Sequence, residues 1–431
     1  MPVAFSTMRR FCFLLFAAAL PLFPPALFAR EADLTARGGE YTLKLALIGA
    51  GDEFVSWWGH LAVIVEDARD RSAVFFDYGV FSFKNEHFYR NLIRGEWIYR
   101  ITAQDARGDI DWYIKDNRDI TCYTLNLDAA RKEYIVSFLN WNALPKNSRY
   151  RYNIFTDNCV SRVAFLLDAA LDGRFLKHFA GEPGEMTVRE EANRHLYRAP
   201  ALYWILNLLM GPDIDKPPSK LAEMFLPEEF VKNALDFEYE NALGELVPLV
   251  SSVEIVHKSR GRPAAPASPP RAAAPALFAG LALAALFGLC AARAQLSARR
   301  GARLVFGAIQ ALWALFLGLC GTLLFYMTFF SAHTYSFHNI NVLFVNPLTL
   351  AAVPASVLYA ASASARRVSL SARILTLVWA LQLAGALLCA ALKVSARFFQ
   401  DNTIIILVIA PAAAALSLAG LLLQRAVALP C

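Results

Sequence analysis

Short stretches of alternating hydrophobic and polar residues characterise the first 260 positions of the chain, whereas the remainder consists mainly of long apolar runs. Alternating stretches rich in β-branched and aromatic residues predict strands, and apolar residues recurring every three to four positions predict helices. We expect strands at residues 42–50, 61–66, 73–79, 96–102 and 121–127, and helices at residues 105–115 and 129–141. Hairpin-linked strands beside helices favour an α+β layer over a doubly wound parallel sheet.

Helical periodicity continues through the second half of this region. In the helix at residues 129–141, Tyr134, Phe138 and Trp141 lie at i, i+4 and i+7, so we expect them to face the core. Further helices are expected after Cys159, at residues 187–193, at residues 200–209, and from the segment MFLPEEF up to residue 246. The apolar run at residues 204–210 is too short to cross a bilayer. It is expected in the core or against the membrane surface.

Five apolar segments follow a Pro- and Ala-rich stretch, residues 258–275, which has no core-forming pattern and marks a domain boundary. The segments are residues 276–292, 304–330, 342–365, 374–394 and 403–423. Each is near the ~20 residues that a membrane-spanning helix needs. We therefore expect an α+β domain at residues 30–257 and an all-α domain with five membrane spans at residues 276–431.

The N-terminus has the pattern of an export signal, with Arg9 and Arg10 before the apolar run 11–22 and a cleavage site ending at Ala29. Residues 1–29 are thus expected to be a signal peptide or, because Leu27 is large for its position, an uncleaved anchor. Either one places the α+β domain outside the cytoplasm.

Orientation of the spans follows from this export. The arginine-rich turns 293–303 and 366–373 then face the cytoplasm, and the loop at residues 331–341, which has no Lys or Arg, faces outward. This agrees with the positive-inside rule, although four basic residues also precede the first span on its outer side.

Composition agrees with a membrane protein that carries a soluble part, since 57% of the 431 residues are hydrophobic. The formal charge of +6 comes partly from arginines that flank apolar spans. No basic stripe interleaves with aromatic residues, so we expect anionic lipid head groups rather than nucleic acid as partners. The seven cysteines include no CxxC and no zinc-ligand spacing, so no metal or other cofactor is expected.

One cysteine occupies a position that favours a reactive thiol. Thr156, Asp157 and Asn158 are capping residue types, and apolar residues recur at helical spacing after Cys159, which is therefore expected in or just before the first helical turn. Free N–H groups and the helix dipole favour a thiolate there. His60, in SWWGH before a strand, offers a base. Alternatively, Cys159 is a small buried hydrophobe and His60 a hydrogen-bonded core or edge histidine.

A disulfide is a further alternative. Cys122 and Cys159 are the two cysteines of the exported domain, and an oxidising compartment would allow them to pair. Cys122 lies within a predicted strand, ITCYTLNL, where a buried thiol is also ordinary.

Four motifs in the exported domain together resemble one family. These are FTDNCVSR around Cys159, the WGH before a strand, DYGVFSF at residues 77–83 and MFLPEEF at residues 224–230, and they are similar to the Lnb N-terminal periplasmic domain family. Residues 338–348 (HNINVLFVNPL) resemble the loop that these proteins carry between membrane spans. The resemblance implies a circularly permuted papain-like fold in which the histidine precedes the cysteine. It also implies thiol-dependent acyl transfer onto bacterial lipoproteins.

Thiol catalysis also needs a group that orients the base and donors that hold the oxyanion. Asp77, on the strand after the one that His60 precedes, is the candidate for orienting the imidazole, or it caps a turn at the strand end. The backbone N–H of Cys159 could supply one oxyanion donor. Asn158 is expected to cap the helix, with an oxyanion or substrate-binding role open. Arg162 is expected either to bind a substrate phosphate or carboxylate, or to be ion-paired or solvated.

Two histidines in the outer loop, His333 and His338, lie near where a lipid head group would sit. Polar residues at a membrane boundary often mark a substrate path. We expect them either to position lipid substrate or to hydrogen-bond to neighbouring residues.

Three functions are compatible with these patterns. The first is a bacterial inner-membrane acyltransferase that moves an acyl chain from phospholipid, through a thioester at Cys159, to the N-terminal amine of lipoproteins. The second is an amidase or peptidase that acts on cell-wall peptides, and the third is a non-catalytic membrane sensor. Five spans favour the first over the second, because a soluble peptide substrate requires no such anchor. The cysteine and histidine argue against the third.

Overall fold

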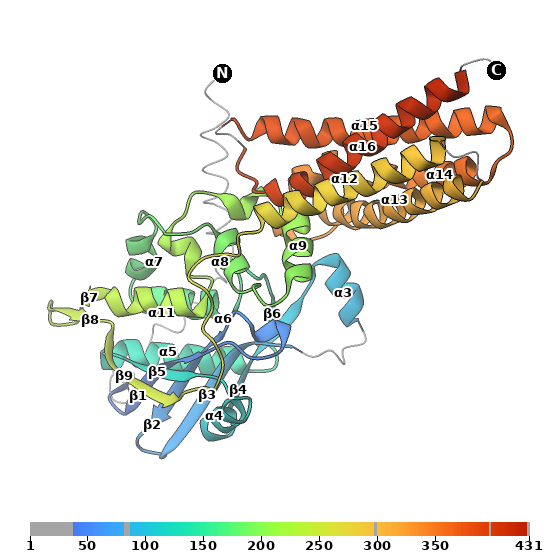
Figure 1. The fold of residues 1–431 in the computed structure, drawn as a ribbon. Helices are drawn as coiled ribbons and strands as arrows, with labels where there is room; N and C mark the ends of the chain where they lie inside the picture. The colour runs from blue at the N-terminus through green and yellow to red at the C-terminus, as the bar shows by residue number, and fades with distance from the viewer. Residues whose placement is uncertain (1–37, 82–86, 297–299, 396–397, 429–431) are drawn as a thin grey trace.

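The computed structural model describes residues 38–81, 87–296, 300–395 and 398–428, so the predicted signal or anchor at residues 1–29 lies outside the described part (Figure 1). The described residues form an α+β domain followed by an all-helical bundle. The first helix of the bundle starts at Ala273, close to the predicted boundary.

A seven-stranded antiparallel sheet organises the α+β domain. Its order is β6-β4-β3-β2-β1-β5-β9. The strands are β1 (Tyr41–Ile48), β2 (His60–Asp67), β3 (Ser72–Val80), β4 (Ile98–Asp105), β5 (Ile120–Leu125), β6 (Arg149–Arg151) and β9 (Val250–His257). Five were predicted, whereas β6 and β9 were missed. The first is only three residues long, and β9 is an edge strand whose central residues are all exposed, so neither carries a strong hydrophobic pattern.

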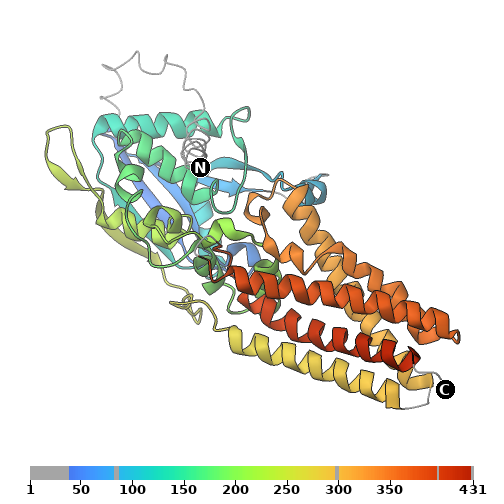
Figure 2. The same cartoon turned by 90° about the horizontal axis from the view of Figure 1, so that it is seen from above.

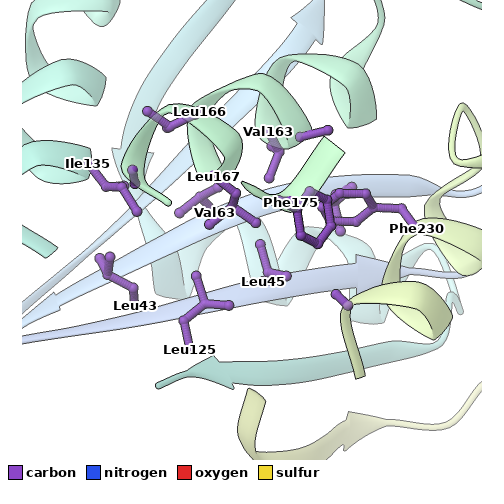
Figure 3. Packing of buried hydrophobic residues seen from close by; sticks show 14 of the residues in the cluster. Leu43, Leu45, Val63, Leu125, Ile135, Val163, Leu166, Leu167, Phe175 and Phe230 are labelled. Atoms are coloured by element: carbon purple, nitrogen blue, oxygen red, sulfur yellow. The ribbon is translucent and has the colours of Figure 1, made fainter. Parts of the chain in front are cut away.

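Both faces of the sheet are covered. The larger core lies between the sheet and α5 (Ala129–Ala143), α6 (Cys159–Ala170), α7 (Arg174–Phe179) and α11 (Pro227–Asp236). Figure 3 shows Val163 and Leu167 of α6 and Phe230 of α11 meeting Leu45 and Val63 of the strands. The smaller core lies between the opposite face and α4 (Ala106–Lys115). Consecutive residues of β1 therefore enter different cores, which explains why few polar residues interrupt this strand.

The buried stripe of α5 differs from the prediction. Ile135, Val136 and Leu139 are buried, whereas Tyr134 and Phe138 are only partly buried beside them. The aromatic residues had the same spacing as the aliphatic stripe, and only the position of the sheet decides which of two adjacent stripes faces inward.

The predicted helix from MFLPEEF to residue 246 is wrong in its second half. Helix α11 ends at Asp236, and the polypeptide then forms a hairpin of β7 (Glu238–Glu240) and β8 (Leu246–Pro248). Phe237 and Tyr239 are buried while their neighbours Glu238 and Glu240 are exposed, which is the two-residue period of a strand.

Shorter elements complete the α+β domain. They are η2 (Phe54–Ser56), α3 (Phe88–Arg94), α8 (Val188–Arg194), α9 (Pro200–Leu209), η3 (Pro212–Asp215) and α10 (Lys220–Glu223). The predicted apolar run at residues 204–210 belongs to α9, which contacts the bundle through Trp204, Leu208 and Leu209. It is a surface element held against the membrane part, one of the two expected positions.

Five helical segments of the bundle are long and apolar enough to cross a membrane. They are α12 (Ala273–Leu296), α13 (Arg300–Phe329), the segment Ile340–Ala361, α15 (Ala365–Leu392) and α16 (Thr403–Ala428). Figure 2 shows them side by side, with the C-terminal end of α16 far from the α+β domain. These segments match the five predicted spans.

The third segment is irregular, consisting of η5 (Ile340–Leu343), η6 (Pro347–Ala351) and α14 (Ala352–Ala361). Backbone groups freed by such irregularity need partners inside a membrane. Gln382 of α15 supplies one, since its Nε2 donates a hydrogen bond to the carbonyl of Phe344 at 3.0 Å. The carbonyl of Phe344, which is itself buried, therefore has a partner within the protein.

The stretch at residues 258–272 contains no helix or strand, as its composition predicts. Its first part is nevertheless held on the α+β domain. The backbone N–H of Ser259 donates to Asp119 at 2.9 Å, and Arg262 pairs with Asp52 at 2.6 Å. Residues 259–262, at the start of the connection between the domains, are therefore held on the α+β domain.

Candidate active site

Helix α6 begins at Cys159, as its capping residues predict. The side chain of Asn158 accepts hydrogen bonds from the N–H groups of Val160 and Ser161, and the hydroxyl of Ser161 accepts one from the N–H of Asn158. This capping box fixes the first turn. The Cys159 side chain therefore lies at the positive end of the helix dipole, and the residue is only 9% exposed.

Both the oxygen and the nitrogen of the Asn158 side-chain amide form hydrogen bonds. Besides accepting from the helix, its Nδ2 donates to the carbonyl oxygens of Ile154 and Phe225, at 2.8 and 2.9 Å. Asn158 thus joins the helix start to the loop before it and to the segment before α11. The substrate-binding role that the sequence left open for Asn158 remains a prediction.

His60 is the first residue of β2 and follows a glycine that the turn requires. Gly59 has a φ of +74°, and a Cβ there would lie 3.0 Å from the carbonyl oxygen of Ile48. Only glycine meets both conditions without strain. The WGH segment thereby brings the backbone sharply into the strand and places the imidazole at the strand's start.

Asp77 of β3 holds the imidazole. Its Oδ1 lies 2.6 Å from Nε2 of His60, and both side chains are less than one-fifth exposed. Burial alone would lower the pKa of His60, but the charges of Asp77, Tyr113 and Cys159 and the Asp77 hydrogen bond raise it well above its usual value. An imidazolium is therefore stabilised at this position. Because Nε2 is engaged by Asp77, Nδ1 is the nitrogen that remains for proton transfer.

Cys159 lies beside the same pair of strands. Helix α6 packs on β2 and β3, and a Cβ placed on Gly79 of β3 would lie 3.8 Å from Cβ of Cys159. The charge of Cys159 is among the causes that raise the pKa of His60, which agrees with a thiol close to the imidazole. Among the described residues the two share no hydrogen bond, and such contacts often tighten only when substrate binds. The structure thus brings Cys159, His60 and Asp77 into one site.

Tyr150 of β6 is a polar group in this site that the sequence did not single out. A Cβ on Gly79 would lie 4.0 Å from its hydroxyl, so the hydroxyl and the Cys159 side chain flank the same point. The hydroxyl is buried and has no hydrogen-bond partner in the part of the protein that the structure describes. Burial raises the pKa of Tyr150, so the hydroxyl keeps its proton and remains a donor.

Arg162 supports Tyr150 rather than projecting into open space. Its guanidinium lies 4.3 Å from the centre of the Tyr150 ring and forms two hydrogen bonds with Asp157, at 2.5 and 2.7 Å. Of the two sequence-based expectations, the geometry places Arg162 in an ion pair. A role in binding substrate phosphate remains a prediction.

Aromatic rings extend from the site. Tyr152, whose pKa is raised by burial and by the neighbouring Cys159, stacks on Tyr99 with 4.1 Å between ring centres. Phe81 stacks on the other ring of this pair, 4.8 Å from Tyr99, and Trp97 lies 6.1 Å from Tyr152. This aromatic wall (Phe81, Trp97, Tyr99 and Tyr152) makes one side of the site apolar.

Comparison with known families gives two matches in the order of the two domains. The Lnb N-terminal periplasmic domain matches residues 35–192, and the Lnb transmembrane domain matches residues 275–406. The chain belongs to the Lnb family. The resemblance noted in the sequence is confirmed, and the protein is a multi-pass membrane protein with a periplasmic N-terminal domain. No curated protein and no solved structure matches it.

The first of these Lnb domains contains Cys159, His60 and Asp77, and it is locked onto the second by the outer loop, residues 331–341. His333 of this loop is buried, and both of its ring nitrogens have partners. Nε2 lies 2.9 Å from the carbonyl oxygen of Leu92, and Nδ1 lies 2.7 Å from the hydroxyl of Tyr335. Burial lowers the pKa of His333, which favours the neutral ring. His333 therefore connects the loop after α13 to helix α3 of the α+β domain.

His338 differs from His333. It is exposed and has a left-handed backbone conformation, with φ of 56°. The structure therefore separates the two histidines, burying one in the interface between the domains. The lipid-positioning role predicted for both remains untested by these contacts.

A layer of buried amides joins the helical bundle to the end of α9 in the α+β domain. Asn339 and Asn341 each donate to the carbonyl of Leu208 at the end of α9, both at 3.0 Å. Gln400, between α15 and α16, donates to Asn339 at 2.8 Å and to Met210 at 3.2 Å. Buried amides are costly unless they are satisfied, so this network specifies one position of the periplasmic domain on the spans.

The alternative of a Cys122–Cys159 disulfide is wrong. Both cysteines are unpaired, and they belong to the cores on opposite faces of the sheet. Burial raises the pKa of the Cys122 thiol to about 11, which makes it inert at neutral pH. Cys159 is thereby left as a free thiol.

Proposed function

We propose that this protein is a thiol acyltransferase of the bacterial inner membrane that moves an acyl chain from phospholipid to the N-terminal amine of lipoproteins. The observation that carries the proposal is the hydrogen-bonded His60–Asp77 pair beside the helix-start thiol of Cys159. A thiol, a base and an orienting carboxylate are the parts of a covalent acyl-transfer mechanism.

The first half-reaction forms a thioester. Nδ1 of His60 takes the thiol proton, and the Cys159 sulfur attacks the ester carbonyl of the phospholipid. The tetrahedral intermediate collapses by breaking the carbon–oxygen bond, and His60 returns the proton to the departing lysophospholipid oxygen. Asp77 stabilises the imidazolium that exists between these two transfers.

The second half-reaction forms an amide. The lipoprotein amine attacks the thioester carbonyl and gives a proton to His60, the carbon–sulfur bond breaks, and the proton restores the Cys159 thiol. The overall reaction consumes one ester and one amine and yields one alcohol and one amide, with no oxidant or reductant.

Both tetrahedral intermediates carry an oxyanion that needs donors. The backbone N–H of Cys159, in the first turn of α6, is one candidate, because such groups have no acceptor within the helix. The Tyr150 hydroxyl is the second, because it is buried, protonated and, among the described residues, unpartnered beside the thiol. A donor without a competing partner is already prepared for the charge that develops.

The membrane part supports lipid as the acyl donor. A phospholipid presents its ester at the membrane surface, and the amide layer formed by Asn339, Asn341 and Gln400 holds the thiol domain at the outer end of the spans. The aromatic wall would exclude water, so that an amine rather than water resolves the thioester.

The test is to express the full-length protein in bacteria that lack lipoprotein N-acylation and to weigh a reporter lipopeptide. The proposal expects the mass of one additional acyl group with the wild type and with Cys122→Ala, and none with Cys159→Ala. An unchanged lipopeptide, together with cleavage of cell-wall peptides by the purified full-length protein, would replace the acyltransferase with an amidase.

A further inference from the structure

Helix α3 carries its apolar residues on the outside. Tyr89 and Ile93 are 73% and 57% exposed, Leu92 is also exposed, and none of its seven residues is buried. Positions 89, 92 and 93 follow the i, i+3, i+4 spacing of one helical face. Arg90 and Arg94, one turn apart, are exposed as well. The helix thus turns an apolar face, accompanied by two positive charges, away from its own domain.

The position of α3 places this face beside the lipid-exposed surface of the spans. The carbonyl of Arg94 accepts a hydrogen bond at 2.7 Å from the N–H of Ala332, just after the end of α13. A Cβ on Gly95 would lie 2.6 Å from the backbone nitrogen of His333, so no side chain fits between helix and loop. The last residues of α13 and its exit, Phe329 and Phe330, are exposed. Figure 1 shows α3 on the side of the α+β domain that faces the bundle.

A short helix with an apolar face and arginines suits the boundary between head groups and acyl chains. Arginine pairs well with phosphate oxygens, and apolar side chains gain free energy by entering the acyl region. The end of α3 contacts the loop that follows α13, and the exposed Phe329 and Phe330 stand just before this loop, so a phospholipid leaflet is the occupant that suits both apolar surfaces.

We propose that α3 lies in the periplasmic leaflet and binds phospholipid, with Tyr89, Leu92 and Ile93 among the acyl chains and Arg90 and Arg94 at the phosphate. The membrane contact stands by itself; that the bound lipid is the acyl donor rests on the proposed function.

A continuous series of rings links this helix to the thiol. Phe88 of α3 stacks with Phe81 at 6.3 Å, and Phe81 belongs to the aromatic wall that ends at Tyr152 beside Cys159. In the proposed arrangement, this series of rings gives the acyl group of a lipid held at α3 apolar neighbours on its way to the nucleophile.

Photo-cross-linking of the full-length protein in nanodiscs of phosphatidylethanolamine and phosphatidylglycerol tests the contact. With p-benzoylphenylalanine in place of Ile93, we expect a protein adduct with the mass of one phospholipid. The matched control places the same group at Leu243, which is 82% exposed in the turn between β7 and β8, and should give no lipid adduct. Equal adducts at both positions, no lipid adduct at position 93, or a protein–protein adduct there would overturn the proposal.

A kinetic test asks whether α3 delivers phospholipid to Cys159. The variant Tyr89→Ser/Ile93→Asp should lower acyl transfer from membrane phospholipid at least about tenfold, because two membrane contacts are lost. Cleavage of a short-chain water-soluble nitrophenyl ester should be unchanged. Equal losses with both substrates would overturn delivery by α3. If the wild type transfers no acyl group, the cross-link still decides whether α3 binds lipid.

Discussion

Nε2 of His60 lies 2.6 Å from Oδ1 of Asp77, and the two residues belong to adjacent antiparallel strands. This contact holds one ring nitrogen in place, and in the proposed mechanism the other nitrogen, Nδ1, serves the Cys159 thiol. Because a strand pair is among the most rigid supports in a small domain, the base is oriented before any substrate arrives.

Removal of the nucleophile should stop the reaction without unfolding the protein. Cys159→Ala and Cys159→Ser are each expected to lower turnover by about 10³-fold or more, because no other group can form the thioester. The measurement is single-turnover acyl transfer, with membrane level and melting temperature as folding controls. Cys122→Ala, on the opposite face of the sheet, should retain activity. Normal turnover by Cys159→Ala would end the thiol mechanism.

The base and its orienting residue should differ in effect. His60→Ala is expected to abolish activity, whereas Asp77→Ala should lower kcat by about 10²–10⁴-fold and leave a measurable remainder, because the imidazole is still present but poorly oriented. The kcat values of both variants, measured beside the wild type, check this order. An Asp77→Ala variant with wild-type kcat would show that Asp77 only caps the strand.

The raised pKa of His60 predicts how stability depends on pH. A histidine whose folded pKa exceeds its unfolded pKa, about 6.5, stabilises the protein fully below that pH and loses this contribution as pH rises through the folded pKa. The wild type should therefore exceed His60→Gln in unfolding free energy at about pH 6, with a smaller difference at about pH 9. Urea unfolding at the two pH values measures this, and a difference that grew with pH would contradict it.

The unpartnered hydroxyl of Tyr150 predicts opposite effects on activity and stability. Tyr150→Phe should reduce kcat by about 10–10³-fold if the hydroxyl stabilises the oxyanion. Stability should stay equal or rise by up to about 1 kcal/mol, because the buried donor has no partner to lose among the described residues. A purely structural tyrosine would lose stability and keep kcat. Rates and melting temperatures measured on the same preparation separate the two.

The topology can be checked without any activity. In a background without other reactive cysteines, Thr334→Cys should react with a membrane-impermeant thiol reagent added outside, and Arg366→Cys should react only after permeabilisation. Both positions are exposed, so accessibility of the side chain is matched. Labelling of Arg366→Cys in intact cells, or protection of Thr334→Cys, would invert the proposed orientation.

Local patterns in the sequence determined several features. The start of α6 at Cys159, the five spans and most strands were predicted, because caps, apolar run lengths and alternation act between near neighbours. The same local motifs pointed to the Lnb family, and His60 and Asp77, which pair in the structure, could be singled out because each belongs to or borders a recognisable strand.

Only the tertiary structure decided features that depend on distant partners. Strand β9 exists because the edge of β5 accepts it, and the inward stripe of α5 is chosen by the sheet beneath. Tyr150 comes close to Cys159 at Gly79, which lies far earlier in the sequence; its φ of +92° favours glycine, and glycine leaves the space beside Cys159 without a side chain. The amides of the outer loop found partners on α9. Free energies of such contacts come from surfaces that meet only after folding, and no local pattern records which surfaces will meet.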